Sequence, residues 1–383
     1  MTIYETELLV NDNILKLWYN LEKHFDKYQK NKERFPIFQF PYQNSDTPLL
    51  AKGSAEPLEG ASLFAQYFHG RDGLSEITRR HPDLSPPPGW STQYLRPTER
   101  SATEVTLDII CSHPPRTVTY VALGPLTNLA RVLREDEEQR FGERIGRVII
   151  MGGALDAPGN VTPAAECTVF QPFINMQRII HEVLASANLP LERVFILPLD
   201  LTGSHILPFA EYKERVDTSF ENTQRSSRPE EKTPLVHFTS AVLEMTREIM
   251  LGFGIDGMEL HDPVAMWCAI ANPQILEHDY NGNSGDDLKP KWNKRKRAFQ
   301  VERYGEYTRG MLVVDRRMDE SNYQPNENRQ QVHTLHSMVA NASVEMTSAQ
   351  EILSGAIQGV NIITETPGSE ELTRMIFQRI FGV

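Results

Sequence analysis

The sequence predicts an α/β fold with an open, mostly parallel, Rossmann-like sheet that carries helices on both faces. Two observations support this prediction. From about residue 101 onward, helix-patterned segments alternate with strand-patterned segments. The strand segments 117–123, 147–151 and 193–199 are continuous runs of mostly apolar and β-branched residues, which is typical of strands buried on both faces. We therefore expect one domain that spans residues 1–383.

The first hundred residues show fewer regular elements. Large apolar residues recur three and four positions apart between residues 13 and 28, which predicts a helix. A short strand is expected at 48–51, and a helix at 62–68 that ends at His69-Gly70. The segment 79–100 is rich in proline and polar residues. It is predicted to be a long surface loop, a feature that is often functional in a compact domain.

The alternating part of the chain predicts helices at 101–113, 127–135 and 174–187 around the three strands. Two polar segments, 213–233 and 281–297, are predicted insertion loops. The second contains a basic run that could be a nuclear address or an anion-binding patch. A solvated loop is the simpler interpretation on an acidic protein. The basic run consists of Lys289, Lys291, Lys294, Arg295, Lys296 and Arg297.

Composition excludes several classes of partner. With 39 Lys and Arg against 51 Asp and Glu, the formal net charge is −12. Such a surface repels phosphate backbones, so no nucleic-acid partner is expected. The sequence contains no stretch of about 18 apolar residues, so no membrane span is predicted. The first residues lack a secretory signal pattern. Cys111, Cys167 and Cys268 lie far apart, so we expect reduced thiols and a cytoplasmic protein.

A ligand site is expected where the predicted parallel strands end, because ligands bind at the carboxyl ends of strands in open α/β sheets. These ends carry the segments 124–128, 152–153 and 200–202, which are rich in glycine, hydroxyl and other polar side chains. Each also has a purely structural explanation. Thr127 or Asn128 could cap the following helix, and Asp200 could bond the backbone of its own turn.

Two histidines add to this site. His261-Asp262-Pro263 opens an apolar helix, where Asp262 could be the helix cap, with Pro263 at the first helical position. Alternatively, Asp262 is a metal ligand and His261 faces the substrate, where it could protonate a leaving group. His69 precedes a glycine-flanked turn and is either an exposed residue at a helix end or a substrate contact in a loop that closes over the ligand.

Several motifs occur in a defined order: PLEG…HGRDGL (57–74), VALGPLTNLA (121–130), IIMGGA…GNVTPAAE (149–166), LPLDLT (197–202), HDP (261–263) and TRGMLVVD (308–315). Taken together, this ordered set resembles the inosine–uridine preferring nucleoside hydrolase family, and its fungal branch in particular. The resemblance covers most of residues 13–315.

The resemblance implies that the chain cleaves the N-glycosidic bond of a small-molecule ribonucleoside and releases ribose and free base. It implies a calcium ion held by the carbonyl of Thr127 and the carboxylate of Asp262, and it places His261 beside the leaving base. Asn160 and Glu166 would hold the ribose. Members of this family are commonly dimers or tetramers, so a homo-oligomer is possible. Oxygen ligands suit calcium, and nearby carboxylates stabilise the cationic transition state of ribosyl cleavage.

Two departures from the family pattern weaken this expectation. The sequence contains no D-x-D-x-x-x-D-D cluster, which the family uses for calcium and for the base that activates water. We therefore expect that the fold lacks its amino-terminal strand and that the chain begins downstream of it. Thr168 stands where the family has an asparagine that binds ribose. Weak or absent hydrolysis is expected, and the alternative is a non-catalytic scaffold protein that keeps the fold.

Overall fold

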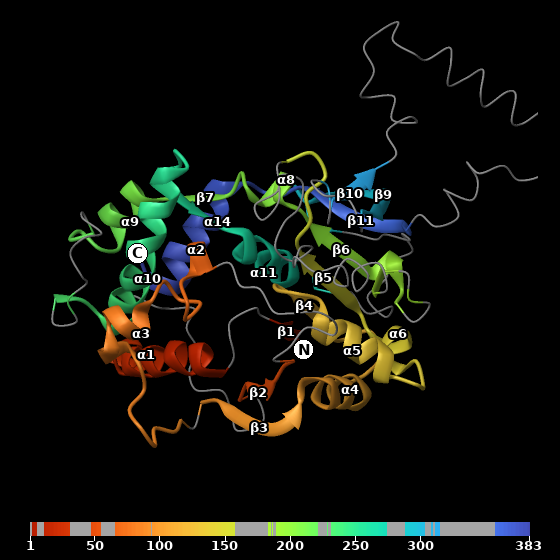
Figure 1. Cartoon of the computed structure of the whole chain (residues 1–383), viewed down its shortest axis with the longest axis horizontal. Coiled ribbons are helices and arrows are strands. Elements are labelled where there is room, and N and C mark those ends of the chain that lie inside the picture. Colours follow the sequence, from red (N-terminus) through yellow and green to blue (C-terminus); the bar gives the residue numbers. More distant parts are fainter. Residues whose placement is uncertain are drawn as a thin grey trace, which may run out of the picture.

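The fold is built around a central sheet of seven strands, seen edge-on to the right of centre in Figure 1. The computed structural model describes residues 2–5, 11–30, 47–54, 66–92, 94–157, 183–184, 186, 189–220, 228, 231–273, 288–302, 308, 311–314 and 357–383. In sheet order the strands are β1 (Thr2–Glu5), β4 (Thr119–Ala122), β5 (Arg147–Met151), β6 (Val194–Leu197), β11 (Ile357–Glu365), β9 (Asn293–Val301) and β10 (Leu312–Val314).

The first five strands in this order run parallel, and β9 is antiparallel to both β11 and β10. The prediction of a mostly parallel sheet is therefore confirmed. The predicted strand 147–151 coincides with β5, and β4 and β6 lie within the predicted strands 117–123 and 193–199. Their five, four and four residues are all buried, as expected for strands covered on both faces.

Side-chain alternation along these strands divides the core into two clusters. In β5, Val148 and Ile150 belong to the cluster under α4 (Ala102–Ser112), α5 (Thr127–Glu135) and α6 (Arg140–Arg144). Ile149 and Met151 belong to the opposite cluster. The helices on that face are α9 (Phe209–Arg215), α10 (Pro234–Gly252), α11 (His261–Ala271) and α14 (Ser369–Ile376). None of the described helices combines the length and the apolar character that crossing a lipid bilayer requires.

Helix α1 (Asn11–Lys30) packs against α10, and the segment 74–84 lies between them. That segment contains α3 (Ile77–Arg80) and the 3-10 helix η1 (Pro82–Leu84). The amide of Asn13 donates to the carbonyl of Asp72 at 2.6 Å, the ammonium of Lys16 donates to Thr78 Oγ1 at 2.8 Å, and the amide of Asn20 donates to the carbonyl of Leu84 at 2.9 Å. These residues lie three and four positions apart, so one polar stripe of α1 holds the whole segment.

Short elements complete the fold. Helix α2 (Gln66–His69) ends at the predicted His69-Gly70 stop. The remaining elements are the parallel pair β2 (Leu49–Lys52) and β3 (Arg96–Ser101), the antiparallel pair β7 (Ile206–Pro208) and β8 (Gly257–Glu259), the 3-10 helix η2 (Leu191–Arg193), the short helix α8 (Leu199–Thr202) and the π-helical turn η6 (Phe377–Phe381).

Several segments differ from the sequence prediction. The fold was expected to lack its amino-terminal strand, but β1 at 2–5 pairs with β4 at the edge of the central sheet; four residues are too few to show a period. The segment 79–100 is not one loop but ends in β3, whose sequence RPTERS has no apolar residue except proline. The segment 281–297 was expected to be a solvated loop, but from Asn293 onward it forms β9. The predicted loop at 213–233 begins within α9, which ends at Arg215.

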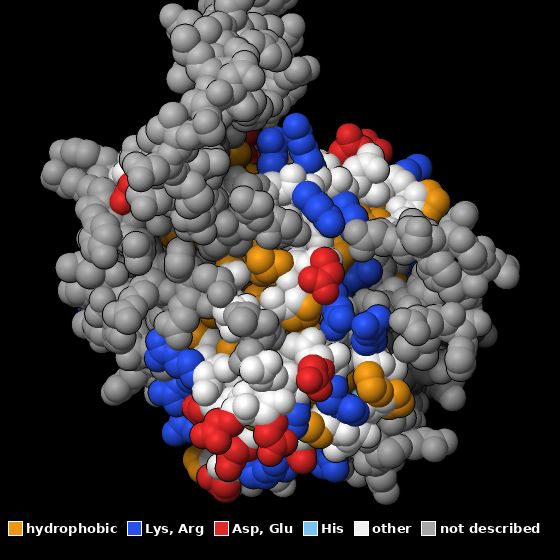
Figure 2. All heavy atoms as spheres, turned by 90° about the vertical axis from the view of Figure 1, so that its right-hand side faces the viewer, with side chains coloured by type: hydrophobic (Ala, Val, Ile, Leu, Met, Phe, Trp, Pro, Cys, Tyr) orange, Lys and Arg blue, Asp and Glu red, His pale blue; other side chains and the backbone are white. Residues whose placement is uncertain are grey.

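The basic run therefore lies just before and within β9, paired with β11. Most of its described side chains are exposed, but Lys294 is half-buried and its ammonium lies 5.0 Å from the ring centroid of Phe195. Figure 2 shows the face that carries this end of the sheet, and basic side chains there are interspersed with acidic ones. The run thus does not dominate the charge of the visible face. Most of the predicted helix at 174–187 lies outside the described residues.

Candidate functional site

The carboxyl ends of β4, β5 and β6 are neighbours in the sheet, as predicted. The turn after β5 is fastened to the end of β6: Gly152 N–H donates to the Leu197 carbonyl at 3.0 Å, and Leu199 N–H donates to the Gly153 carbonyl at 2.8 Å. Gly152 and Gly153 have φ values of 147° and 88°, a backbone conformation that strongly favours glycine. The two glycines therefore shape this turn, and we call the region around the three strand ends the strand-end site.

Asp200 follows β6 and clamps the neighbouring loop. Its carboxylate accepts hydrogen bonds from the backbone N–H groups of Leu155, Asp156 and Ala157, at 2.8, 2.6 and 2.9 Å. These bonds reach into the loop after β5, so the prediction that Asp200 bonds its own turn is wrong. A carboxylate with several backbone donors is well suited to this role because it accepts up to four hydrogen bonds.

Thr127 and Asn128 open α5 at the end of β4. The residue in the cap position is Leu126, which makes no side-chain cap bond, so the prediction that Thr127 or Asn128 caps the helix is wrong. The side-chain oxygen of Asn128 instead accepts from Ser54 N–H at 2.8 Å, which ties the segment after β2 to α5. Thr127 is buried at this junction.

His261 is held on both ring nitrogens. Its Nδ1 lies 2.8 Å from the Thr202 hydroxyl at the end of α8, and its Nε2 lies 3.3 Å from the carboxylate of Glu259 in β8. Thr202 is completely buried, whereas His261 and Glu259 keep about a quarter of their side-chain surface exposed (24% and 27%). The backbone before it is also fixed, because Leu260 N–H donates to the His205 carbonyl at 2.7 Å. His261 is thus oriented by the protein yet reachable from solvent.

Asp262 lies inside the first turn of α11 and does not cap it. The cap position belongs to Leu260, with no side-chain cap bond, so the capping prediction for Asp262 is wrong. The side chain is exposed at a helix end where the backbone dipole favours negative charge. Because α11 packs against β4 and β5, its first turn lies with His261 beside the strand-end site.

His69 is the exposed last residue of α2. Loss of hydration and, to a smaller degree, the charge of His261 lower the pKa of His69. The turn that follows is firmly built. The carboxylate of Asp72 accepts from the backbone N–H groups of Leu74, Glu76 and Thr78 at 2.8–2.9 Å and from the Thr78 hydroxyl at 2.7 Å. Burial alone would raise the pKa of Asp72, but these bonds outweigh it and lower the pKa.

The structure therefore brings His261 together with Thr202 and Glu259 and places His69 within electrostatic reach. The predicted ribose-binding residues Asn160, Glu166 and Thr168 lie outside the described residues. Glu259 was not predicted; its only sequence signal is its position two residues before the HDP motif.

The two predicted ligands are of the type that calcium prefers, but they are too few to complete a calcium site. The Asp262 carboxylate and the Thr127 carbonyl are hard oxygen donors, which calcium prefers, but calcium takes about six to eight oxygens. Among the described residues, the two predicted ligands do not complete such a site, so we derive no catalytic step from the metal.

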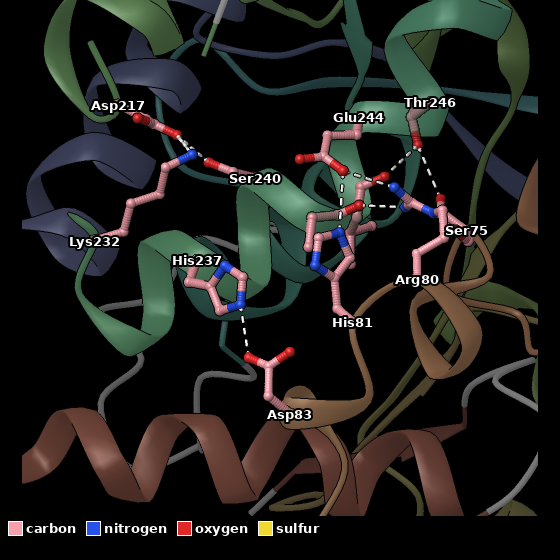
Figure 3. A network of polar contacts seen from close by, with 12 residues as sticks. Ser75, Arg80, His81, Asp83, Asp217, Lys232, His237, Ser240, Glu244 and Thr246 are labelled. Carbon is pink, nitrogen blue, oxygen red and sulfur yellow. Dashed lines mark hydrogen bonds and ion pairs between the residues drawn. The ribbon is translucent and has the colours of Figure 1, made fainter. Parts of the chain in front are cut away.

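A second polar cluster lies along α10, where it joins this helix to the segment 75–83 and to Asp217 and Lys232 (Figure 3). Sequence reasoning missed it because its residues are far apart in the chain and one partner segment was predicted to be a loop. We call it the α10 network; its members are Ser75, Arg80, His81, Asp83, Asp217, Lys232, His237, Ser240, Glu244 and Thr246.

Glu244 is the centre of one half of this network. Its carboxylate oxygen Oε2 lies 2.7 Å from Arg80 Nη1 and 3.1 Å from His81 Nε2. Arg80 also donates to the carbonyls of Ser75 and Ala241, at 2.9 and 2.6 Å. The side chains of Glu244 and His81 are 4% and 3% exposed, and that of Arg80 is 19% exposed, so the carboxylate and the imidazole are almost fully withdrawn from water.

In the other half, Asp217 accepts from Lys232 at 2.6 Å and from the Ser240 hydroxyl at 2.5 Å. Burial by itself raises the pKa of Asp217, but the hydrogen bonds from Lys232, Ser240 and Ser219 outweigh it, and the pKa lies below its usual value. Between the two halves, His237 Nε2 lies 2.9 Å from the Asp83 carboxylate.

Comparison with known proteins supplies the family context. The profile of the family described as inosine-uridine preferring nucleoside hydrolase matches residues 40–345. An uncharacterized protein of Schizosaccharomyces pombe is 29% identical over 273 residues, which cover 70% of this chain and 71% of that protein. The probable uridine nucleosidase 2 of Oryza sativa subsp. japonica is 26% identical over 232 residues, which cover 59% of this chain and 58% of that protein.

A similar solved structure is that of an inosine-guanosine nucleoside hydrolase. It has a TM-score of 0.58 and 18% sequence identity, and the likeness covers 100% of this chain and 90% of that chain. At this level of identity the likeness concerns the fold, and it agrees with the central, mostly parallel sheet.

Proposed function

Because the chain belongs to the inosine-uridine preferring nucleoside hydrolase family, we propose that it binds a ribonucleoside at the strand-end site and hydrolyses the N-glycosidic bond slowly. The observation that carries this proposal is the position of His261, held between Thr202 and Glu259 beside the ends of the parallel strands. This is the edge of an open α/β sheet where ligands bind.

The residues around His261 suit an acid that assists a leaving base. The Glu259 carboxylate lies 3.3 Å from Nε2 and orients that side of the ring. The Thr202 hydroxyl fixes the ring orientation through Nδ1. A nucleobase leaves more easily when it receives a proton as the bond to ribose breaks. In this proposal His261 donates that proton, and His69 at the end of α2 contacts the substrate.

Slow turnover follows from the groups that this sequence does not contain. The 383 residues include no D-x-D-x-x-x-D-D cluster, and Thr168 replaces the expected asparagine. Loss of a general base costs about 10²–10⁴-fold in rate. With Asp262 and Thr127 as its protein ligands, calcium would bind at about the millimolar level or more weakly. When bound, calcium would chelate the ribose hydroxyls.

The test is ribose release from inosine and from uridine by the purified 383-residue chain, with and without millimolar calcium. We expect slow release that increases with calcium and that Asp262→Ala and His261→Ala both abolish. A matched control is Glu371→Ala, which removes an exposed carboxylate of α14 and should leave the rate unchanged.

Two other outcomes contradict the proposal. Release that persists in Asp262→Ala and His261→Ala would place the chemistry elsewhere. No release from a folded chain at saturating calcium would favour a non-catalytic scaffold, for which Thr168 in the ribose-binding motif is the supporting sequence observation.

A further inference from the structure

We infer that His81, Asp83 and His237 form a second metal site, built for a divalent transition metal ion such as zinc. One ligand atom from each of the three side chains lies within 4.8 Å of the other two. His81 and Asp83 come from the start of η1, and His237 comes from the first turns of α10 (Figure 3). This inference does not depend on the proposed hydrolase activity, because none of its residues belongs to the strand-end site.

The donor types select the kind of metal. Two imidazoles and one carboxylate are typical ligands of zinc and of neighbouring transition metals, whereas calcium binds oxygen almost exclusively. Zinc–ligand distances of about 2.0–2.1 Å place the ligand atoms of a tetrahedral site about 3.3–3.4 Å apart. The present arrangement therefore needs side-chain shifts of about an ångström, and His237 Nε2 and Asp83 Oδ2, now at 2.9 Å, would separate slightly.

His81 has the outer support that metal-binding histidines usually have. The Glu244 carboxylate accepts from Arg80 at 2.7 Å and lies 3.1 Å from His81 Nε2, where it can accept a hydrogen bond from that nitrogen. The proton on Nε2 leaves the lone pair of Nδ1 available for a metal. A carboxylate that accepts from the outer nitrogen fixes the ring and makes the inner nitrogen a better ligand.

Burial prepares the site and leaves one side open. The side chains of His81 and His237 are 3% and 2% exposed, whereas that of Asp83 is 47% exposed. The two imidazoles are therefore held in place by packing, with ring centroids 5.4 Å apart, and an ion can enter on the Asp83 side. That side also leaves room for water as a fourth ligand, which zinc sites with three protein ligands commonly have.

A bound ion would cross-link two parts of the fold. The segment 74–84 lies between α1 and α10, and the metal would join its η1 end directly to α10. Binding to the folded chain alone stabilises it in proportion to the logarithm of the free metal concentration. The alternative is that His237 and Asp83 lie close together only because they form a hydrogen bond. In that case added zinc would not stabilise the chain, whereas a metal site predicts that it would.

The test is a titration of the full, chelator-treated chain with zinc chloride, monitored by isothermal titration calorimetry. A parallel titration with cobalt(II) as a substitute ion is monitored by visible absorption. We expect one zinc ion per chain with micromolar or tighter affinity, and an increase in Tm with zinc. Asp83→Asn should weaken binding at least tenfold. This variant should fold, because about half of the Asp83 side chain is exposed and asparagine still accepts from His237.

His237→Gln should abolish the cobalt absorption, and the matched control Glu371→Gln should leave zinc affinity unchanged, because Glu371 is an exposed residue of α14 outside both sites. Binding weaker than about millimolar, or zinc binding that Asp83→Asn and His237→Gln leave unchanged, overturns the inference. If His237→Gln does not fold, Asp83→Asn decides the question. Because the readout is metal affinity, a chain without hydrolase activity can still support the inference.

Discussion

The strand-end site and the α10 network hold their charged side chains in opposite ways. His261 and Glu259 keep about a quarter of their side-chain surface exposed, so water reaches both groups. Glu244 and His81 are almost completely buried, and one carboxylate oxygen of Glu244 contacts both His81 and Arg80. Water competes with the first set of contacts but not with the second. The comparison indicates that the contacts of the strand-end site can be replaced by a ligand, whereas those of the α10 network stabilise the fold.

The largest effect expected from this comparison is that of Glu244→Ala. The variant leaves the mostly buried Arg80 guanidinium without its carboxylate partner, so unfolding should become easier by about 3–5 kcal/mol. Urea denaturation followed by circular dichroism measures this change. The exposed pair of Glu371 and Arg374 provides the control, because Glu371→Ala should change stability little. A loss of stability below about 1 kcal/mol for Glu244→Ala would show that the buried pair contributes no more than an exposed one.

An intermediate effect, with a pH signature, is expected at Asp217. Its pKa in the folded state lies below the usual value because the bonds from Lys232, Ser240 and Ser219 outweigh the effect of burial. The stability it contributes is therefore present above about pH 4 and is lost as the pH falls through the lower, folded-state pKa. Asp217→Asn should lower stability at pH 7 by about 1.5–3 kcal/mol and should flatten this acid dependence.

Denaturation curves at a series of pH values between neutrality and strong acid would show this difference. Asp72 also has a lowered pKa and remains in both proteins, so only the difference between wild type and variant is assigned to Asp217. Parallel pH profiles for the two proteins would show that Asp217 does not supply the acid dependence.

The smallest effect is expected at the strand-end site itself. Asp200→Ala removes the acceptor of the backbone N–H groups of Leu155, Asp156 and Ala157. Because Asp200 is exposed, water can replace it, and the loss of stability should be about 1 kcal/mol. Hydrogen exchange of these amides should nevertheless become faster. Unchanged exchange would show that the loop after β5 is held by other contacts.

Three parallel strands of the central sheet, β4, β5 and β6, were predictable because each carries a local signal, whereas β1 and β11 were not predicted. β5 coincides with the predicted strand because its residues are buried on both faces and mostly apolar. The strand-end site followed from the same reasoning, since polar residues after parallel strands must meet. The hydrogen-bond partners of the residues in this site could not be predicted from the sequence. Asp200 bonds a different loop and Asn128 bonds the segment after β2, and local sequence contains no information about such distant partners.

The α10 network shows the same limit more strongly. Asp83 and His237 are separated by 154 positions, and Asp83 lies in a proline-rich segment that resembles a loop. Strands β3 and β9 were missed because both are mostly polar, so pairing with a neighbouring strand, rather than an apolar period, determines their conformation.

The position of β11 between β6 and β9 affects how the sheet can assemble. During synthesis β6 and β9 leave the ribosome before β11, so each presents an unpaired edge until the later strand arrives. Pairing between distant parts of a chain slows folding, and open strand edges promote association between unfinished chains. We therefore expect the yield of native protein in cells to depend on chaperones and on the rate of translation more than on the stability of the finished fold.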